Sequence, residues 1–232
     1  MSPRVVAIDG PAASGKSTTA RKVADALGFR HLNSGLLYRA VAWAARERGW
    51  SASEPPGEGG EGVLEAMLGE LDLDLVPLDG EYGVRVEGRR PGPELREPDV
   101  TELASVLSAR EPVRRRVTGL VRGEGGRRDV VCDGRDIGTV VFPGADLKVY
   151  LDASPRERAR RRLLERGEDP GGAALDREAE RLRARDEADS SRAISPLRPA
   201  EDALRVDTTH RSAAEVVDLI VEEAARRGIA PA

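Results

Sequence analysis

The sequence has 232 residues, enough for one domain with an added lobe, and 39% of them are hydrophobic but only 3% aromatic. The core must therefore be built from Val, Leu, Ile and Ala, as in a parallel sheet covered by helices. A formal net charge of -4 argues against a general nucleic-acid coat, and the single cysteine, Cys132, excludes an internal disulfide. No apolar run is long enough to cross a bilayer, and the opening MSPRVVAIDG lacks a secretory pattern, so we expect a cytoplasmic protein.

The N-terminal part of the chain predicts strands that alternate with helices. A β-branched run is followed by a glycine-rich turn and a helical pattern that stops at Gly28, a residue suited to a helix C-cap. A short strand and an Ala-rich helix come next. The predicted elements are a strand at 5–8, a turn at 10–15, a helix at 17–27, a strand at 30–32 and a helix at 36–48.

The middle of the chain changes its pattern. Residues 51–62 (SASEPPGEGGEG) are rich in Gly, Pro and Glu and separate two regions. Beyond them Leu71, Leu73 and Leu75 alternate with acidic residues, as in a half-buried strand, and residues 82–86 read as its partner across a turn. We therefore predict a small β-rich insert at 63–96, followed by one helix over 99–122.

The C-terminal part returns to alternating strands and helices. It predicts strands at 129–132, 147–151 and 203–206, and helices at 155–166, 176–190 and 213–227. Such alternation implies a parallel sheet with right-handed crossovers. We predict an α/β domain made of residues 1–62 and 97–232, interrupted by the insert.

The most informative motif lies between the first strand and the first helix. Gly10-Pro-Ala-Ala-Ser-Gly15-Lys16-Ser17 matches the phosphate-binding pattern G-x-x-x-x-G-K-[ST]. Its backbone N–H groups can cradle phosphate oxygens at a helix N-terminus, Lys16 can reach the β- and γ-phosphates, and the Ser17 hydroxyl can ligate Mg²⁺. The alternative is a chance glycine-rich turn, but the strand–turn–helix context favours a P-loop that binds ATP.

A P-loop does not by itself name the substrate, because GTPases, ATPases and small-molecule kinases share it. The guanine-reading motif N-K-x-D is absent from the sequence. Nearly all the cations are arginines, and a kinase needs convergent cations around two polyanionic substrates. The arginines therefore favour a kinase.

Further motifs carry a family resemblance. Asn33-Ser34-Gly35-Leu36-Leu37-Tyr38-Arg39, then DGRDIGTVVFP at 133–143, and RAISPL at 192–197 follow the P-loop in order. With these motifs the sequence resembles the bacterial cytidylate kinases over essentially its whole length. The resemblance implies a three-layer P-loop fold with a lid at about 153–175 and the insert on the acceptor side. It also implies that ATP phosphorylates CMP or dCMP in the presence of Mg²⁺.

The resemblance also implies roles for individual residues. The ATP-phosphate loop would be Gly10, Pro11, Ala12, Ala13, Ser14, Gly15, Lys16, Ser17 and Thr18. Arg39, Arg135 and Arg192 would bind the acceptor phosphate, with Ser34 beside it; Ser105, Arg114 and Asp136 would read cytosine; Arg185 and Asp189 would hold the ribose. Arg158, Arg161 and Arg162 fall in the lid segment. The residues expected to act on the transferred group are Lys16, Arg135, Arg192, Arg158 and Arg162.

The residue types agree with those roles. Arg185, Asp189 and Arg192 would share one face of a helix if it runs that far, and the planar guanidinium suits bidentate phosphate binding. A hydroxyl, a carboxylate and a guanidinium can match the donor and acceptors of cytosine. One departure is Asn33, where the family usually has Asp, so we leave it out of the catalytic set.

Several residues have plainer interpretations. Arginine-rich helices are most often solvated faces with pairs such as Glu157–Arg161, an interpretation that covers Arg115, Arg116, Arg127, Arg128 and Arg160. Asp133 reads equally well as a strand-end carboxylate near Mg²⁺ or as a turn acid. The sequence assigns structural roles to His31 and His210, and packing roles to Cys132, Trp43 and Trp50.

The sequence alone leaves two rival functions open. One is a kinase for another small acceptor, such as UMP or shikimate. The other is a nucleotide-dependent regulator that binds RNA, which the mild acidity and the few aromatic residues disfavour. We expect ATP and CMP or dCMP as partners, no nucleic acid, no membrane, and a monomer.

Overall fold

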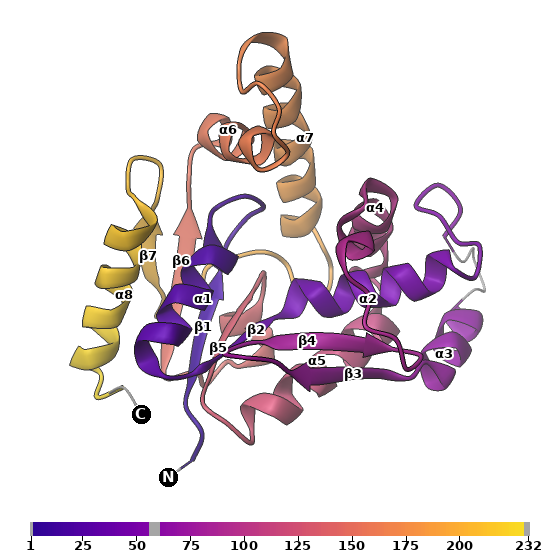
Figure 1. Cartoon of the computed structure of the whole chain (residues 1–232), viewed down its shortest axis with the longest axis horizontal. Coiled ribbons are helices and arrows are strands. Elements are labelled where there is room, and N and C mark those ends of the chain that lie inside the picture. Colours follow the sequence, from indigo (N-terminus) through magenta and orange to yellow (C-terminus); the bar gives the residue numbers. More distant parts are fainter. Residues whose placement is uncertain (1, 56–60, 230–232) are drawn as a thin grey trace. The chain divides into compact units, whose positions relative to one another are not determined.

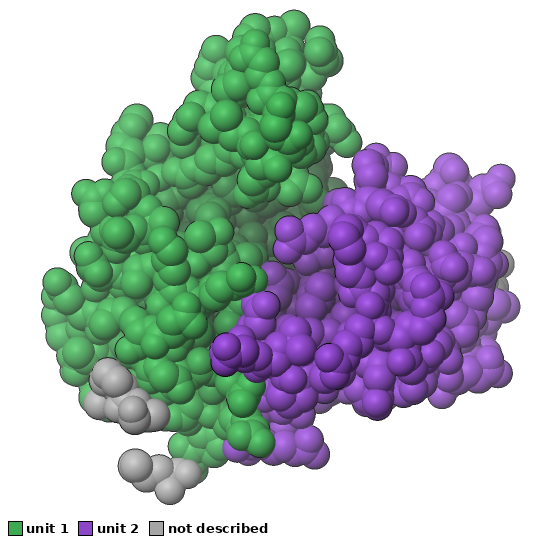
Figure 2. Space-filling model, viewed as in Figure 1, with its two compact units in different colours: residues 1–31, 128–232 green, residues 32–127 purple. Residues whose placement is uncertain are grey.

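The computed structural model describes residues 2–55 and 61–229, which form two compact units. Unit 1 comprises residues 1–31 and 128–232, and unit 2 comprises residues 32–127 (Figure 2). Part of the predicted separator at 51–62 lies outside the described residues. Unit 2 is wider than the insert expected at 63–96, which lies inside it.

A five-stranded sheet forms the centre of unit 1, in the order β2-β5-β1-β6-β7 (Figure 1). Strand β1 pairs in parallel with β5 and β6, and β6 pairs in parallel with β7. The strands are β1 (Val5–Asp9), β2 (Arg30–Asn33), β5 (Val130–Gly134), β6 (Leu147–Asp152) and β7 (Leu204–Asp207). Every residue of β1 and β5 is buried, which is why both read as β-branched runs without alternation. The predicted α/β fold with a parallel sheet is confirmed.

Helices α1 (Lys16–Leu27) and α8 (Ala213–Arg226) cover one face of this sheet (Figure 1). Val23 and Leu27 of α1 and Ile220 of α8 pack in one cluster with strand residues such as Ile8. Gly28 ends α1 in the left-handed conformation, as the sequence predicts, and Ser212 begins α8 with a capping box. These contacts fix the start of α1, where the glycine-rich loop ends.

Helices α6 (Pro155–Glu165) and α7 (Gly172–Ser190) lie side by side (Figure 1). Leu163 of α6 packs with Leu175 and Leu182 of α7, together with Ala12 of the glycine-rich loop. The Ser154 side chain accepts the N–H of Glu157 and caps α6. The predicted lid at 153–175 therefore corresponds to α6 and the first turn of α7.

Unit 2 contains an antiparallel hairpin among helices. Strands β3 (Leu73–Pro77) and β4 (Tyr82–Val86) pair with each other, which confirms the predicted hairpin. The helices are α2 (Ser34–Arg46), α3 (Glu61–Glu70), the short η1 (Pro93–Arg96), α4 (Pro98–Leu107) and α5 (Glu111–Gly125). Leu64, Met67 and Leu68 are buried on α3, so the region read as β-rich also contains a helix.

One boundary prediction is wrong. The single helix expected over 99–122 is two helices, α4 and α5, with a break at 108–110. Pro112 in the first turn of α5 lacks an N–H and disfavours a preceding helical residue, so the chain ends one helix and begins another. Helix α7 ends at Ser190, as predicted, so Arg192 lies beyond it and does not extend its face. Within the described residues, no helix is both long and apolar enough to span a membrane.

Candidate active site

The glycine-rich loop connects β1 to α1 and has a tightly constrained backbone. A Cβ atom at Gly10 would lie 2.1 Å from the Leu151 carbonyl oxygen, so only glycine fits there. Gly15 caps α1 with φ 86, and Ala13 adopts φ 58, which is unusual for a residue with a side chain. The loop therefore takes the strand–turn–helix geometry that the phosphate-binding motif requires.

Lys16 begins α1 and is buried. Its Nζ donates to the Pro11 carbonyl oxygen at 2.8 Å, across the loop. Burial and the nearby Arg135 guanidinium hold the pKa of Lys16 well below its usual value, although Asp133 and Asp189 oppose the shift. A bound phosphate group would favour the charged form of Lys16 and oppose this shift.

Ser17, Asp133 and His31 form a chain of hydrogen bonds beside the loop. The Ser17 hydroxyl donates to Asp133 Oδ2 at 2.6 Å, and His31 Nε2 lies 2.7 Å from Asp133 Oδ1. Burial alone would raise the pKa of Asp133, but the hydrogen bonds from His31 and Ser17 and the charge of Lys16 lower it overall. Asp133 is a strand residue of β5 and not a turn acid, and His31 has the partner that its sequence context did not reveal.

Asp9, the last residue of β1, holds the DGRDIGT segment in place. Its carboxylate accepts the N–H groups of Ile137 and Gly138 at 2.8 and 2.7 Å, at the start of the short π-helix η2 (Ile137–Val141). Burial raises the pKa of Asp9 to about 7, with a smaller contribution from Asp136. Asp9 thereby fixes the backbone that carries Arg135 and Asp136.

An arginine cluster, consisting of Arg135, Arg185 and Arg192, surrounds the buried carboxylate of Asp189. Arg135 Nε donates to Asp189 at 2.9 Å, and Arg192 forms a short ion pair with the other oxygen. Arg192 follows the end of α7, but the chain turns back there, since the Leu197 N–H bonds to the Asp189 carbonyl. The structure thus brings together all the acceptor-site residues predicted around α7.

Arg185 gives this cluster its excess positive charge. Its Nε is buried and has no hydrogen-bond partner within residues 2–55 and 61–229. Burial and repulsion from Arg135 lower the pKa of Arg185 to about 10, although Asp189 attracts it. Three guanidinium groups share a single carboxylate, so the cluster can accommodate an anion.

The three predicted lid arginines occupy different environments. Arg158 is only 4% exposed; it donates to the Ala12 carbonyl at 3.1 Å and to Asp186 at 2.5 Å. Arg161 pairs with Glu157, as the sequence suggests, and also donates to the Thr208 carbonyl oxygen at 2.6 Å. Arg162 lies nearer the surface and pairs with Glu165. Arg158 and Arg161 thus support the loop, because Thr208 in turn donates to the Ser14 carbonyl.

Unit 2 carries the remaining predicted acceptor residues. Ser34 is buried and Arg39 is half-buried, both on α2, whose first turn is capped by Asn33 accepting the Leu36 N–H at 3.1 Å. The Asn33 side chain thus has a helix-capping role. Arg39 Nη1 would lie 3.4 Å from a Cβ built at Gly35, which places its guanidinium over that first turn.

Ser105 and Arg114 are each hydrogen-bonded to Ser108, which lies in the break between α4 and α5. Arg114 is buried, stacks 5.5 Å from the Tyr38 ring centroid and donates to the Ser108 carbonyl at 3.1 Å. Ser108 in turn donates its hydroxyl to the Ser105 carbonyl at 2.9 Å. The break that separates the two helices therefore links these two residues. Asp136, predicted with them, belongs to unit 1.

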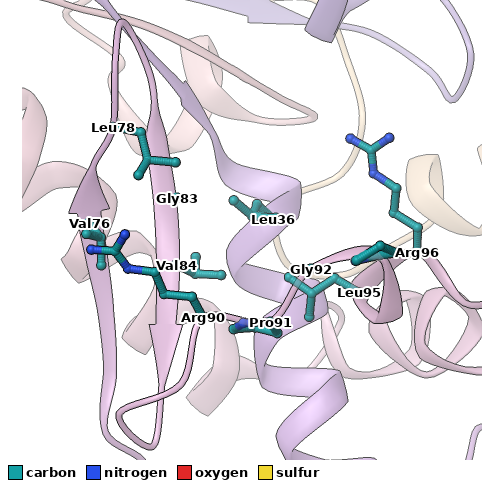
Figure 3. Close-up of a pocket in the computed structure, with 11 residues that line it drawn as sticks. Leu36, Val76, Leu78, Gly83, Val84, Arg90, Pro91, Gly92, Leu95 and Arg96 are labelled. Atoms are coloured by element: carbon teal, nitrogen blue, oxygen red, sulfur yellow. The ribbon is translucent and has the colours of Figure 1, made fainter.

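A separate pocket of about 390 Å³ lies in unit 2, between the hairpin, α2 and η1 (Figure 3). Leu36, Val84 and Leu95 provide apolar walls, and Arg90 and Arg96 also line it. The residues that line this pocket do not include any of the nucleotide- or substrate-binding residues predicted from the sequence.

Several residues for which the sequence predicts a packing or surface ion-pair role have such a role in the structure. Cys132 is fully buried in β5, and Trp43 packs beneath the Arg89 guanidinium at 5.1 Å. Arg115 and Arg160 pair with Glu65 and Glu157. Among residues 2–55 and 61–229 no group of His, Cys, Asp and Glu forms a metal cluster.

The parallel sheet, the constrained loop and the buried lysine define the class of P-loop nucleotide-binding proteins. A comparison with known families narrows the class. Residues 6–226 match the family described as cytidylate kinase, and the chain belongs to that family.

Curated relatives agree with this assignment. The bifunctional pantoate ligase/cytidylate kinase of Synechocystis sp. is 43% identical over 222 residues, covering 94% of this chain and 42% of that protein. The cytidylate kinase of Thermotoga sp. is 44% identical over 218 residues and 94% of each chain. The chain thus spans less than half of the first relative and nearly all of the second. An uncharacterized protein from Eubacterium ventriosum shares the fold, with a TM-score of 0.51 at 10% identity over 96% of this chain and 98% of its own.

Proposed function

We propose that this chain transfers the γ-phosphoryl group of ATP to CMP or dCMP, giving ADP and CDP or dCDP. Membership of the cytidylate kinase family supports this activity. The observation that carries it is the arginine cluster, in which Arg135, Arg185 and Arg192 share one carboxylate. A buried excess of guanidinium charge suits a ligand that brings its own phosphate groups.

The proposed ATP site is the loop that contains Lys16. Its N–H groups and the N-terminus of α1 would hold the phosphates, and Lys16 would shift from the Pro11 carbonyl to the β- and γ-phosphate oxygens. Arg158 and Arg161 would keep the loop in shape through their bonds to Ala12 and Thr208. Arg162, near the surface of α6, would serve as the lid cation for the transferred group.

The residues beside the loop fit Mg²⁺, which takes oxygen ligands and retains several waters. The Ser17 hydroxyl donates its proton to Asp133, and a hydroxyl oxygen can ligate a cation while its proton is donated. Ser17 would hold the ion directly and Asp133 would hold it through water. When bound, the ion would neutralise charge between the β- and γ-phosphates.

We propose acceptor roles for residues of each unit. In unit 1, Arg135 and Arg192 would bind the 5′-phosphate, while Arg185 and Asp189 would hold the ribose. In unit 2, Ser34 and Arg39 are proposed for the phosphate, and Ser105 and Arg114 for cytosine, with Asp136 of unit 1. Burial of Arg114 and Asp136 would disfavour a base that lacks the exocyclic amine, since their hydrogen bonds to it would be unmet.

The chemistry requires no general base. A phosphate oxygen of the acceptor is already nucleophilic and would attack the γ-phosphorus in line, while Lys16, Arg135 and Arg192 neutralise the developing charge. Positioning of the two substrates and exclusion of water would supply the remaining acceleration.

A panel of acceptors tests the proposal. Release of ADP from ATP and Mg²⁺ is measured with CMP, dCMP, UMP and shikimate at equal concentrations. We expect CMP or dCMP to support the highest kcat/KM, with UMP weaker by about 10²-fold or more, because its base leaves buried polar groups unpaired. Equal use of UMP and CMP would contradict the assignment of Ser105, Arg114 and Asp136.

The role of Arg192 has its own test. Arg192→Ala should raise the KM for CMP by at least about tenfold and leave the KM for ATP within about twofold, since a lost charged hydrogen bond costs about 1.5–3 kcal/mol. Arg160→Ala is the matched control, because Arg160 is exposed and, within residues 2–55 and 61–229, its guanidinium pairs with Glu157 alone. An unchanged KM for CMP in Arg192→Ala would contradict the assigned role.

A further inference from the structure

His31 lies in β2, next to β5 in the sheet, and its side chain is 4% exposed. Its Nε2 is 2.7 Å from Oδ1 of Asp133, whose side chain is 3% exposed. The ionised carboxylate can only accept hydrogen bonds, so the proton between them is carried by His31 Nε2. The side chain therefore acts as a buried donor to this one oxygen.

The other oxygen of Asp133 is engaged by Ser17, whose hydroxyl donates to Oδ2 at 2.6 Å. The two donors occupy the two oxygens of one carboxylate, and so fix its rotation. A carboxylate with fixed rotation also fixes the direction of the Ser17 O–H bond, and hence of the Ser17 lone pairs. The chain His31–Asp133–Ser17 thus runs from the edge strand of the sheet to the first turn of α1.

We propose that His31 is a positioning residue for the magnesium–nucleotide complex, acting through Asp133 on the hydroxyl of Ser17. The proposal rests on the proposed function in taking Ser17 as the magnesium ligand. The interaction does not require His31 to touch either substrate. It predicts that His31 matters for nucleotide bound with magnesium and not for nucleotide bound without it.

Substituting His31 separates this role from simple packing. His31→Leu removes the donor, whereas His31→Gln retains an N–H at a reach similar to that of Nε2. His210→Leu is the matched control, since His210 is the second histidine of the chain and is exposed. ADP affinity is measured by calorimetry with Mg²⁺ and again with EDTA, and thermal unfolding of each variant is recorded.

We expect His31→Leu to weaken binding of ADP with Mg²⁺ about tenfold, the loss of about one hydrogen bond to a charged group. ADP binding in EDTA should change by less than about twofold, and His31→Gln should recover most of the tenfold loss. kcat with ATP and CMP should fall in His31→Leu and recover in His31→Gln. His210→Leu should match the wild type in every measurement.

Equal weakening with and without Mg²⁺, or a His31→Gln variant as impaired as His31→Leu, would overturn the proposal and leave His31 a packing residue. If His31→Leu does not fold, the ring nitrogens of the wild type are observed by ¹⁵N NMR. A proton on Nε2 supports the proposal, and a bare Nε2 overturns it. Because ADP binding involves no CMP, a wild type that fails to phosphorylate CMP would refute the proposed function and leave this test intact.

Discussion

We expect Arg185, which is proposed to hold the acceptor's ribose, to lower the stability of the ligand-free protein. Burial and the neighbouring Arg135 lower its pKa to about 10, so the folded state holds this charge less favourably than the unfolded chain at every pH below that value. A shift of this size corresponds to roughly 3 kcal/mol, and partial exposure of the side chain reduces it to about 1–2 kcal/mol. Arg185→Met removes the charge and keeps an unbranched apolar side chain of similar width.

We therefore expect Arg185→Met to raise the Tm of the ligand-free protein by about 2–6 °C and to weaken CMP binding by about tenfold or more. Thermal unfolding and calorimetric titration with CMP measure the two effects. Arg183→Met is the matched control, because Arg183 lies on the same helix but is exposed and pairs with Glu180. A lower Tm for Arg185→Met with unchanged CMP affinity would mean that Arg185 stabilises the fold and does not contact CMP. That result would contradict both expectations.

Three further predictions follow from single side chains. Burial raises the pKa of Asp9 to about 7, so between pH 4 and 7 the folded protein keeps a proton on Asp9 that the unfolded chain releases. The free energy of unfolding should therefore fall by about 2–4 kcal/mol as pH rises from about 4 to 7. Urea unfolding should show this pH dependence in the wild type and not in Asp9→Asn. Asn33→Ala should lower the free energy of unfolding in urea by about 1 kcal/mol, because the cap of helix α2 is lost. Asn33→Asp should leave it almost unchanged, because Asp can also cap a helix. Lys16→Ala should lower kcat by at least about 10²-fold with no loss of Tm, because a buried amine is removed; a normal kcat would contradict its role.

Part of the fold could be predicted because two neighbouring strands of the main sheet, β1 and β5, are fully buried. Val5–Asp9 and Val130–Gly134 have no exposed face, so an uninterrupted β-branched run identifies each within one or two residues. The break between α4 and α5 was not predicted, because the helical spacing continues through it and only Pro112 marks the restart. Helix α3 was also not predicted, because glycine- and proline-rich residues before it and the alternating leucines after it favour a β-rich region.

Residues of the candidate site could be proposed from the sequence where they lie in contiguous motifs. The glycine-rich loop and the DGRDIGT segment are recognisable as motifs in the sequence. Arg185 and Arg192 of the arginine cluster lie near or just beyond the C-terminal end of α7. Asp9, Asp186, Thr208 and the partner of His31 could not be predicted, because their contacts join residues far apart in sequence. Asp9 and Ile137, for example, are separated by 128 positions, and no local spacing relates them.

We propose that the loop and the arginine cluster together move a phosphoryl group between two nucleotides. This transfer can be followed by ³¹P NMR in a mixture of the purified protein, ATP, Mg²⁺ and CMP. We expect CDP and ADP to appear in equal amounts, with almost no inorganic phosphate. Inorganic phosphate without CDP, or no reaction at all, would contradict it.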